Sequence, residues 1–241
     1  MAELRAGTSG WHYQHWRGVF YPTDLKTRDW LSFYARHFET VEVNNSFYRL
    51  PAPETFATWR SNTPEGFTFA VKANRFITHV KRLRDPEEPL SRFFRSAAGL
   101  EEKLGPILFQ LPPRWQAVPE RLRDFARSLP RGYRYVFEFR DPSWFLPEIY
   151  QVLEEANCAL CAASSPAFPE VRRTTADFAF LRFHGGKILY GSKYSREELS
   201  EWASYALDLL AEGRDVYAYF NNDAYGYALE DALLFLDLCR T

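Results

Sequence analysis

The sequence predicts a single (β/α)₈ barrel domain that takes in residues 1–241. Short runs of β-branched and aromatic residues alternate along the chain with longer segments whose apolar residues recur at helical spacing. Such alternation favours parallel strands joined by helices. The 241 residues of the chain also provide about 30 residues for each of eight such units, the size of a βα repeat in this fold.

Eight runs have the composition and length of strands buried on both faces. In chain order they are Leu4–Ser9, Thr40–Asn44, Phe67–Ala73, Pro106–Leu111, Tyr135–Arg140, Ala159–Ala163, Phe178–His184 and Val216–Asn221.

Seven segments between these runs are amphipathic and predict helices. They are Asp29–Phe38, Glu54–Asn62, Leu90–Lys103, Glu120–Ser128, Leu146–Ala156, Glu197–Ala211 and Ala228–Leu238. Before Glu197–Ala211, Ser195 and Glu198 have the spacing of a capping box, which marks the start of a helix.

The sixth unit departs from the pattern. Its strand, Ala159–Ala163, is short, and Ser165–Arg173 contains two prolines and no helical spacing. An open, doubly wound sheet is the alternative architecture. It is disfavoured because no glycine-rich phosphate turn follows the first strand, and residues 7–10 lack the glycine spacing of such a turn.

Composition limits the class of protein but selects no partner. The formal net charge is -1, so binding to a nucleic acid would need a local basic patch. No run approaches the roughly 18 apolar residues of a membrane helix, and the first ten residues lack the pattern of a signal peptide. Three cysteines are too few and odd in number for a secreted disulfide framework, which favours a reduced, cytoplasmic protein without membrane partners.

Polar residues share one face of the predicted strands and concentrate toward their carboxyl ends. Because side chains alternate along a strand, the apolar face should meet the helices and the polar face should point into the barrel. The residues predicted at the mouth are Glu42, Asn44, Lys72, Gln110, Glu138, Arg140, Arg182, His184 and Asn221. Active sites of such barrels lie at this end. Paired charges that only fill the barrel interior are the structural alternative for any single member.

Motifs along nearly the whole chain, in a fixed order, also resemble one family. They are residues 7–13 with Trp16, Gly18 and 20–22; 42–44 with 47–49 and Pro51; 69–72 with 78–79; 110–113; 138–140 with 143–144; 182–185; and 219–223 with Gly226. These motifs resemble the domain of unknown function 72 family, the YecE-like proteins. Ser46 stands where many members have threonine. The resemblance implies a TIM-type barrel related to sugar isomerases, and it implies no particular reaction.

Four residues are candidates for catalysis. Glu138 and His184 are the preferred pair for proton transfer, since burial tunes a carboxyl toward neutral pH and histidine titrates near it. Glu42 is a second candidate acid or base. Lys72 is predicted mainly as a cation that binds substrate, with roles as a general base or Schiff-base nucleophile left open.

Other polar and aromatic residues are candidates for substrate binding. Arg140 and Arg182 suit a phosphate or carboxylate, because guanidinium groups bind such anions in pairs of hydrogen bonds. Amides, hydroxyls and aromatic faces suit a sugar or a nucleobase. The remaining candidates are Trp11, Tyr13, Asn44, Tyr48, Gln110, Trp144, Asn221, Asn222 and Asp223. For the aromatic residues, packing of the loops over the mouth is the alternative role.

The sequence therefore predicts an isomerase or hydrolase that acts by acid/base catalysis on a small polar, sugar-like or phosphorylated substrate. Two alternatives remain: nucleic-acid binding or metal-assisted phosphodiester hydrolysis, and ligand binding without turnover. No cofactor is predicted. A divalent metal remains open, because His184 could combine with Glu42, Glu138 or Asp223, although no close ligand spacing is present. The substrate, the reaction and the oligomeric state cannot be read from the sequence.

Overall fold

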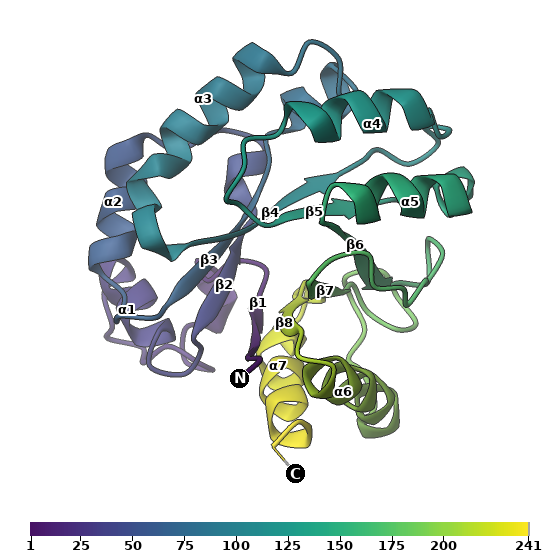
Figure 1. Ribbon diagram of the computed structural model, residues 1–241. Helices are drawn as coiled ribbons and strands as arrows, with labels where there is room; N and C mark the ends of the chain where they lie inside the picture. Colours follow the sequence, from purple (N-terminus) through teal and green to yellow (C-terminus); the bar gives the residue numbers. More distant parts are fainter. Residues whose placement is uncertain (241) are drawn as a thin grey trace.

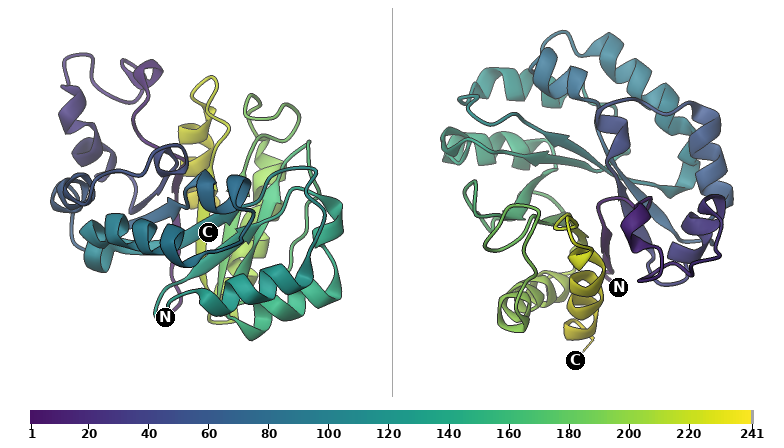
Figure 2. Two further views of the ribbon diagram at one scale, coloured as in Figure 1. Left: turned by 90° about the horizontal axis from the view of Figure 1, so that it is seen from above. Right: turned by 180° about the vertical axis from the view of Figure 1, so that it is seen from behind.

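A computed structural model describes residues 1–240 and contains eight parallel strands surrounded by helices (Figures 1 and 2). The strands are β1 (Leu4–Thr8), β2 (Thr40–Val43), β3 (Thr68–Lys72), β4 (Leu104–Gln110), β5 (Tyr135–Glu138), β6 (Cys158–Ser164), β7 (Phe178–Phe183) and β8 (Asp215–Phe220). Their order in the sheet is β1-β8-β7-β6-β5-β4-β3-β2, all parallel. The predicted (β/α)₈ barrel is confirmed.

The barrel closes between β1 and β2 by a short seam. Ser9 and Glu42 form an isolated parallel bridge. Below it, the Tyr34 hydroxyl accepts a hydrogen bond from the Thr8 N–H at 2.9 Å and donates to the Thr40 carbonyl oxygen at 3.1 Å. The hydroxyl thus stands in for a strand-to-strand hydrogen bond. Gly7 permits this approach, since a Cβ there would lie 2.3 Å from the Thr40 oxygen.

Seven α-helices lie outside the strands in the described chain, as Figures 1 and 2 show from three sides. They are α1 (Trp30–Tyr34), α2 (Pro53–Ser61), α3 (Glu87–Ala97), α4 (Pro119–Ser128), α5 (Pro147–Glu155), α6 (Arg196–Ala211) and α7 (Tyr227–Leu238). Helices α2, α4 and α5 each begin at a proline, whose fixed φ and missing N–H suit the first turn. The capping box of Ser195 and Glu198 is present at the start of α6.

Two helices differ from their predicted extents. The segment Asp29–Phe38 contains only the five residues of α1, preceded by the 3-10 turn η2 (Thr27–Asp29). The segment Leu90–Lys103 leaves α-helical geometry after Ala97 and continues as the 3-10 segment η5 (Ala98–Lys103). Gly99 in η5 packs so closely on α2 that a Cβ there would lie 2.1 Å from the Pro53 carbonyl oxygen. Tertiary packing therefore ends α3 early.

No helix joins β6 to β7 within the described chain, as the two prolines of Ser165–Arg173 predict. The loop instead begins at the mouth, where Phe168 packs on His184 and under Arg140, and continues to the outside of the barrel. Arg172 lies over the Trp202 ring of α6 with its guanidinium carbon 4.0 Å from the ring centroid. The Thr175 hydroxyl bonds the β6 backbone, accepting from the Leu160 N–H and donating to the Cys158 carbonyl. These contacts replace the cover that a helix would provide.

The apolar residues form two separate clusters. The larger lies between the outer face of the sheet and the helices and contains, for example, Val41, Phe109 and Phe137. The smaller fills the barrel interior with residues such as Leu108 and Phe180. The predicted division into an apolar outer face and an inner face that turns polar at the mouth is therefore confirmed.

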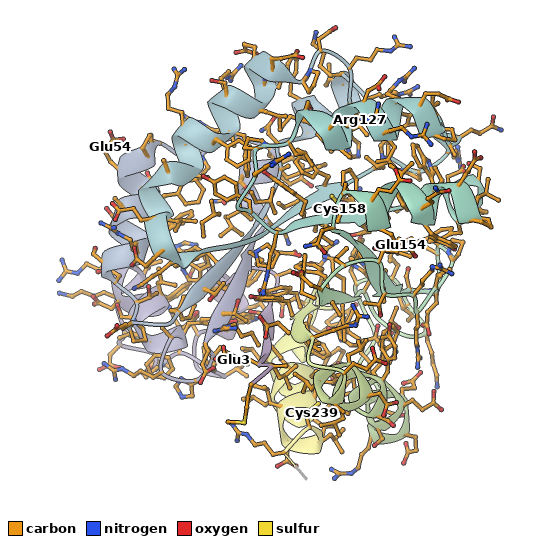
Figure 3. All side chains as sticks on the ribbon, in the orientation of Figure 1. Glu3, Glu54, Arg127, Glu154, Cys158 and Cys239 are labelled. Atoms are coloured by element: carbon orange, nitrogen blue, oxygen red, sulfur yellow. The ribbon has the colours of Figure 1, made fainter. Side chains whose placement is uncertain are left out.

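Cys158, Cys161 and Cys239 are all free thiols. Figure 3 shows Cys158 near α5 and Cys239 near the C-terminal end, far from each other. In residues 1–240, every helix is too short or too polar to cross a membrane.

Candidate functional site

One guanidinium group joins two carboxylates inside the barrel mouth. Arg182 donates from Nε to Glu42 Oε2 at 2.8 Å and from Nη2 to Glu42 Oε1 at 2.7 Å, and its Nη1 donates to Glu138 Oε2. Ser9 Oγ also donates to Glu42 Oε1 at 2.8 Å. All three charged side chains are fully buried. A charge buried this deeply is tolerable only because its hydrogen-bonding capacity is met by opposite charge.

Small residues next to Arg182 make room for it. Ala163 of β6 is its register partner, and Ala70 and Cys161 belong to the apolar cluster that fills the barrel interior. Because these side chains are short, a long arginine extends across the barrel and reaches carboxylates on both β2 and β5. The sequence places the charges on the inner face, and the sizes of their neighbours let them meet.

Arg140, His184 and Asn221 extend this cluster toward the opening. Arg140 Nε donates to Glu138 Oε1 at 2.7 Å, and its side chain is 14% exposed. The Asn221 amide lies 3.2 Å from His184 Nδ1. Burial and then Arg182 lower the pKa of His184 to about 4, although Glu138 opposes them, so its imidazole is neutral at pH 7.

The charges of this cluster balance. Two carboxylates, Glu42 and Glu138, face two guanidinium groups, Arg182 and Arg140. Burial alone would raise the pKa of Glu138, but Arg182 and Arg140 outweigh it and hold that pKa well below its usual range. Glu138 therefore stays ionised at all physiological pH values.

Lys72 is the cation that this balance leaves over. Lys72 is the last residue of β3 and is 9% exposed. Its Nζ lies over the Phe47 ring, 4.1 Å from the ring centroid. Nζ makes no hydrogen bond or ion pair with any of residues 1–240. Burial, followed by the charge of Arg182, lowers the pKa of Lys72 to about 7, while Glu138 and Glu42 act in the opposite direction. This buried amine is thus close to half protonated at neutral pH.

A cavity of about 580 Å³ lies above this cluster at the mouth of the barrel. Eight predicted site residues line it: Tyr13, Asn44, Tyr48, Lys72, Gln110, Arg140, Asn221 and Asp223. Lys72 and Gln110 are the last residues of β3 and β4, and the other six residues lie in the segments that follow β1, β2, β5 and β8. Their roles in catalysis or binding stay predictions.

Four predicted residues form the floor beneath the cavity and do not line it: Glu42, Glu138, Arg182 and His184. Three others lie elsewhere. Trp11 lines a neighbouring cavity. Trp144, predicted at the mouth, is fully buried, stacks on Phe139 at 4.9 Å between centroids, and donates from Nε1 to the Trp115 carbonyl oxygen.

Asn222 is the third residue that the sequence placed at the mouth and the structure does not. It is fully buried and donates to the Ser192 carbonyl oxygen and to Asp231. Its neighbour Asp223 faces the cavity, because successive residues after a strand point in different directions. The Asn-Asn-Asp run thus divides between the cavity wall and the packing of the β7–α6 loop.

Several residues that line the cavity were not among the predicted site residues. His15, outside the strands in η1 (Gln14–Trp16), places Nε2 3.0 Å from Asp223 Oδ2, and burial raises the pKa of Asp223 to about 6. His79 belongs to the π-helical segment η4 (Phe76–Val80), and burial lowers its pKa to about 4. Tyr190 comes from the β7–α6 loop and meets Arg140. Strand parity carries no information on such loop residues.

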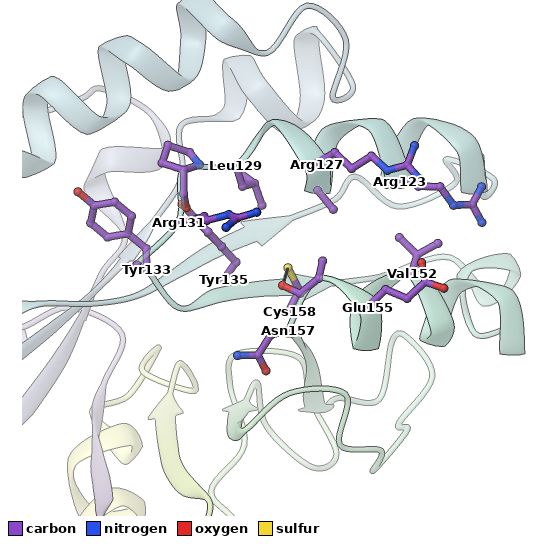
Figure 4. Close-up of a pocket in the computed structure, with 14 residues that line it drawn as sticks. Arg123, Arg127, Leu129, Arg131, Tyr133, Tyr135, Val152, Glu155, Asn157 and Cys158 are labelled. Carbon is purple, nitrogen blue, oxygen red and sulfur yellow. Dashed lines mark hydrogen bonds between the residues drawn. The ribbon is translucent and has the colours of Figure 1, made fainter.

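Another cavity of about 540 Å³ lies at the opposite end of the barrel (Figure 4). Tyr135 and Cys158 in its wall are the first residues of β5 and β6. Arg123 and Arg127 lie along α4 above it, and Arg131 lies on the following loop. Active sites of these barrels lie at the carboxyl ends of the strands, so this cavity is not the candidate site.

No group of three or more His, Cys, Asp or Glu side chains in residues 1–240 is arranged to hold a metal ion. At the predicted metal position, His184 Nε2 lies 3.7 Å from Glu138 Oε1. The Glu138 carboxylate already accepts hydrogen bonds from Arg140 and Arg182.

Comparisons with known proteins agree with the fold and the motifs. A family model described as "Protein of unknown function DUF72" matches residues 5–241. The UPF0759 protein YunF of Bacillus subtilis is 27% identical over 96% of this chain and 93% of that protein. The UPF0759 protein YecE of Escherichia coli K12 is 35% identical over a shorter stretch, 48% of this chain and 43% of that protein.

Solved structures extend the likeness to the whole fold. A DUF72 family protein of Thermotoga maritima is 31% identical and superposes with a TM-score of 0.90 over 99% of this chain and 100% of that one. A DUF72 family protein of Enterococcus faecalis, 23% identical with a TM-score of 0.83, shares the fold over 99% of this chain and 96% of that one. On the family model and the Thermotoga structure together, the chain belongs to the DUF72 family.

Proposed function

We propose that this protein is an enzyme that binds a small polar substrate through an anionic group and moves a proton with Lys72. The observation that carries the proposal is the buried, unpaired ammonium of Lys72 at the cavity, with a pKa of about 7. An ionisable group in a cleft whose pKa is strongly perturbed is a candidate for function, because a purely structural role gives no reason to bury an uncompensated charge.

The charge balance supports an anionic substrate. The carboxylates of Glu42 and Glu138 are balanced by the guanidinium groups of Arg182 in the floor and Arg140 in the cavity wall, so protonated Lys72 has no counter-ion. A phosphate or carboxylate in the cavity would supply one, and Arg140, which lines the same cavity, would supply further N–H donors to it. The bound anion would also raise the pKa of Lys72, because a nearby negative charge favours the protonated amine.

Proton transfer falls to Lys72 in this proposal, rather than to Glu138 and His184. In the floor beneath the cavity, Glu138 is held ionised and His184 is held neutral. A general acid or base works best when its pKa is near the ambient pH. Lys72 meets this condition at about 7, and Asp223, which lines the same cavity, meets it at about 6. Protonated Lys72 would donate a proton to the substrate, and ionised Asp223 would accept one from it, as an isomerisation or a hydrolysis requires.

Binding of inorganic sulfate tests the anion site without a known substrate. Titration calorimetry should show that Lys72→Met weakens sulfate binding at least about tenfold. Lys187→Met, which removes an exposed lysine, should leave it unchanged. Arg140→Gln should also weaken binding, with Arg127→Gln at the far cavity as its matched control. Equal sulfate affinity in wild type and Lys72→Met would contradict the proposal.

Turnover is tested with a panel of phosphorylated and carboxylated metabolites, followed by NMR. The expected result is conversion of one class of compound by wild type and Lys187→Met, and loss of that conversion in Lys72→Met. Sulfate binding that depends on Lys72, without conversion of any compound in the panel, would favour a ligand-binding protein and count against the catalytic part of the proposal.

A second candidate function is the binding of a nucleic-acid strand, favoured by a basic strip beside the mouth. Burial and the charges of Arg84 and Arg82 lower the pKa of Arg121, so these three cations lie close together. Arg82 and Arg121 each lie within 5.9 Å of the Trp115 ring centroid. Nanomolar to micromolar binding of a labelled oligonucleotide that weakens with salt and with Arg84→Gln would support this candidate; millimolar or absent binding would remove it.

A further inference from the structure

A second cavity, of about 630 Å³, adjoins the one above Lys72. Its wall comes from the loop after β1, from η2 and α1, from the end of β2 and from α2. Two residues, Tyr13 and Asn44, line both cavities and so form the partition between them. A molecule held at Lys72 therefore lies beside a second compartment.

We propose that the two cavities bind two halves of one substrate: an anionic group over Lys72 and Arg140, and a ring in the compartment beside Trp11 and Trp59. This inference rests on the proposed function, and it specifies the substrate class. The substrate would be a small phosphate or carboxylate that bears one ring with an apolar face and a hydrogen-bonding edge.

The walls of the second compartment match such a ring. The indoles of Trp11 and Trp59 meet at 89° with centroids 4.9 Å apart, so they present two perpendicular apolar surfaces. Trp11 is 8% exposed and is fixed from behind by Phe69, while Trp59 is only partly buried. The polar residues Asn45, Asn62 and Thr58 also line this compartment, together with His12, Thr27, Arg28, Gly10 and Leu31. Aromatic faces bordered by a few polar groups are how proteins bind rings.

Asn44 lies between the two cavities, where the anionic group and the ring of the proposed substrate would be connected. Its Oδ1 is buried and finds no hydrogen-bond donor within residues 1–240. Leaving such an oxygen unsatisfied costs about 1–3 kcal/mol. Because Asn44 lines both cavities, a ligand that spans them passes this amide, and a hydroxyl or N–H of the ligand would satisfy it.

Tyr13 is a fixed part of the wall that the two cavities share, rather than a loose loop side chain. Its hydroxyl donates to the Ser9 carbonyl oxygen at 2.5 Å, and its ring packs on Trp16 with centroids 4.9 Å apart. Gly10 has a φ of 100° and lies beneath that hydroxyl; a Cβ there would come within 2.8 Å of it. The backbone thus sets the partition in place before any ligand arrives.

Three phosphate monoesters separate the two halves experimentally: methyl phosphate, glucose 6-phosphate and phenyl phosphate. They present a similar anion, and only the last two bear a ring, a hydroxylated one in the sugar ester and an aromatic one in the phenyl ester. Measured by calorimetry at one pH, at least one ring-bearing ester should bind about tenfold or more tightly than methyl phosphate, the gain expected from a ring packed on indole.

Two substitutions in α2 test whether the added affinity of the ring-bearing esters comes from the second compartment. Thr58→Trp should fill the second compartment from an exposed position and abolish the preference for the ring, and Thr58→Ser is its matched control. Trp59→Ala should do the same by removing a wall. Methyl phosphate should bind all these variants as it binds wild type, which also shows that they remain folded.

The outcomes separate this inference from the proposed function. A preference for either ring-bearing ester that Thr58→Trp removes supports the inference, and the preferred ester identifies the ring as a sugar or an aryl group. Methyl phosphate binding that depends on Lys72, together with no preference for a ring or one that Thr58→Trp leaves intact, would overturn the inference and leave the proposed function standing. Absence of Lys72-dependent binding for all three esters would overturn both.

Discussion

Replacing Lys72 by methionine should stabilise the protein at neutral pH even though it removes a proposed functional group. Methionine fills nearly the same space as the lysine stem and carries no charge. Folding lowers the pKa of Lys72 from 10.5 to about 7. At about 1.4 kcal/mol for each tenfold change in proton affinity, folding the wild-type protein at about pH 7 carries a cost of about 4 kcal/mol at this one side chain. Lys72→Met escapes that cost.

The sign of the pH dependence follows from the same two pKa values. Between about pH 7 and pH 10.5 the unfolded chain binds more protons at Lys72 than the folded protein does, so the free energy of unfolding of wild type rises with pH in this window. The advantage of Lys72→Met should therefore shrink from about 4 kcal/mol near pH 7 to about 2 kcal/mol near pH 9. This change is independent of how well methionine packs.

Urea unfolding followed by tryptophan fluorescence measures this difference, in buffers free of phosphate and sulfate, because bound anions would stabilise wild type. Lys187→Met is the control, since its lysine is exposed in the folded protein, and its stability should differ from wild type by the same small amount at every pH. A Lys72→Met protein whose difference from wild type does not change between neutral and alkaline pH would refute the reasoning.

Other predictions concern the floor, the seam and the anion site. Glu138→Gln leaves Arg182 with one carboxylate fewer inside the barrel and should lower the free energy of unfolding by about 3–5 kcal/mol; a loss below about 1 kcal/mol would show that the pair is dispensable. Gly7→Ala, whose Cβ would lie 2.3 Å from the Thr40 oxygen, should lower the free energy of unfolding by about 2 kcal/mol or more in the same assay. An unchanged stability would mean that β1 and β2 can move apart at the seam without cost. Sulfate affinity of wild type should fall several-fold from about pH 7 to about pH 9 as Lys72 loses its proton, and calorimetry that finds a flat profile would contradict the assigned pKa.

Strand periodicity was enough to predict which polar side chains enter the barrel, but not their depth. Glu42, Lys72, Glu138 and Arg182 all share the inner face, as parity requires. Parity does not reveal that Arg182 extends far enough across the barrel to join carboxylates on β2 and β5, because that depends on the small side chain of Ala163 beside it. Whether a polar residue lies in the floor or in the cavity wall is therefore determined by the sizes of the neighbouring side chains.

Loops and helix ends were harder to predict for a related reason. Trp144 follows β5 closely in sequence, yet its side chain is buried against Phe139. Burying the large apolar surface of an indole is more favourable than leaving it exposed to solvent at the mouth. His79 enters the cavity through a π-helical turn that no periodicity signals. The early end of α3 follows from the contact of Gly99 with α2, which is remote from it in the sequence. These features depend on tertiary contacts, which a single sequence does not reveal.

The most direct measurement of the central claim is the pKa of Lys72 itself. Reductive methylation with ¹³C-formaldehyde labels the lysines, and the Lys72 signal is assigned by its loss in Lys72→Met. Titration should give a pKa of about 7, against about 10 for exposed lysines, and saturating sulfate should raise it. A value near 10 without sulfate, or a low value that sulfate leaves unchanged, would contradict the claim that Lys72 is an unpaired cation awaiting an anion.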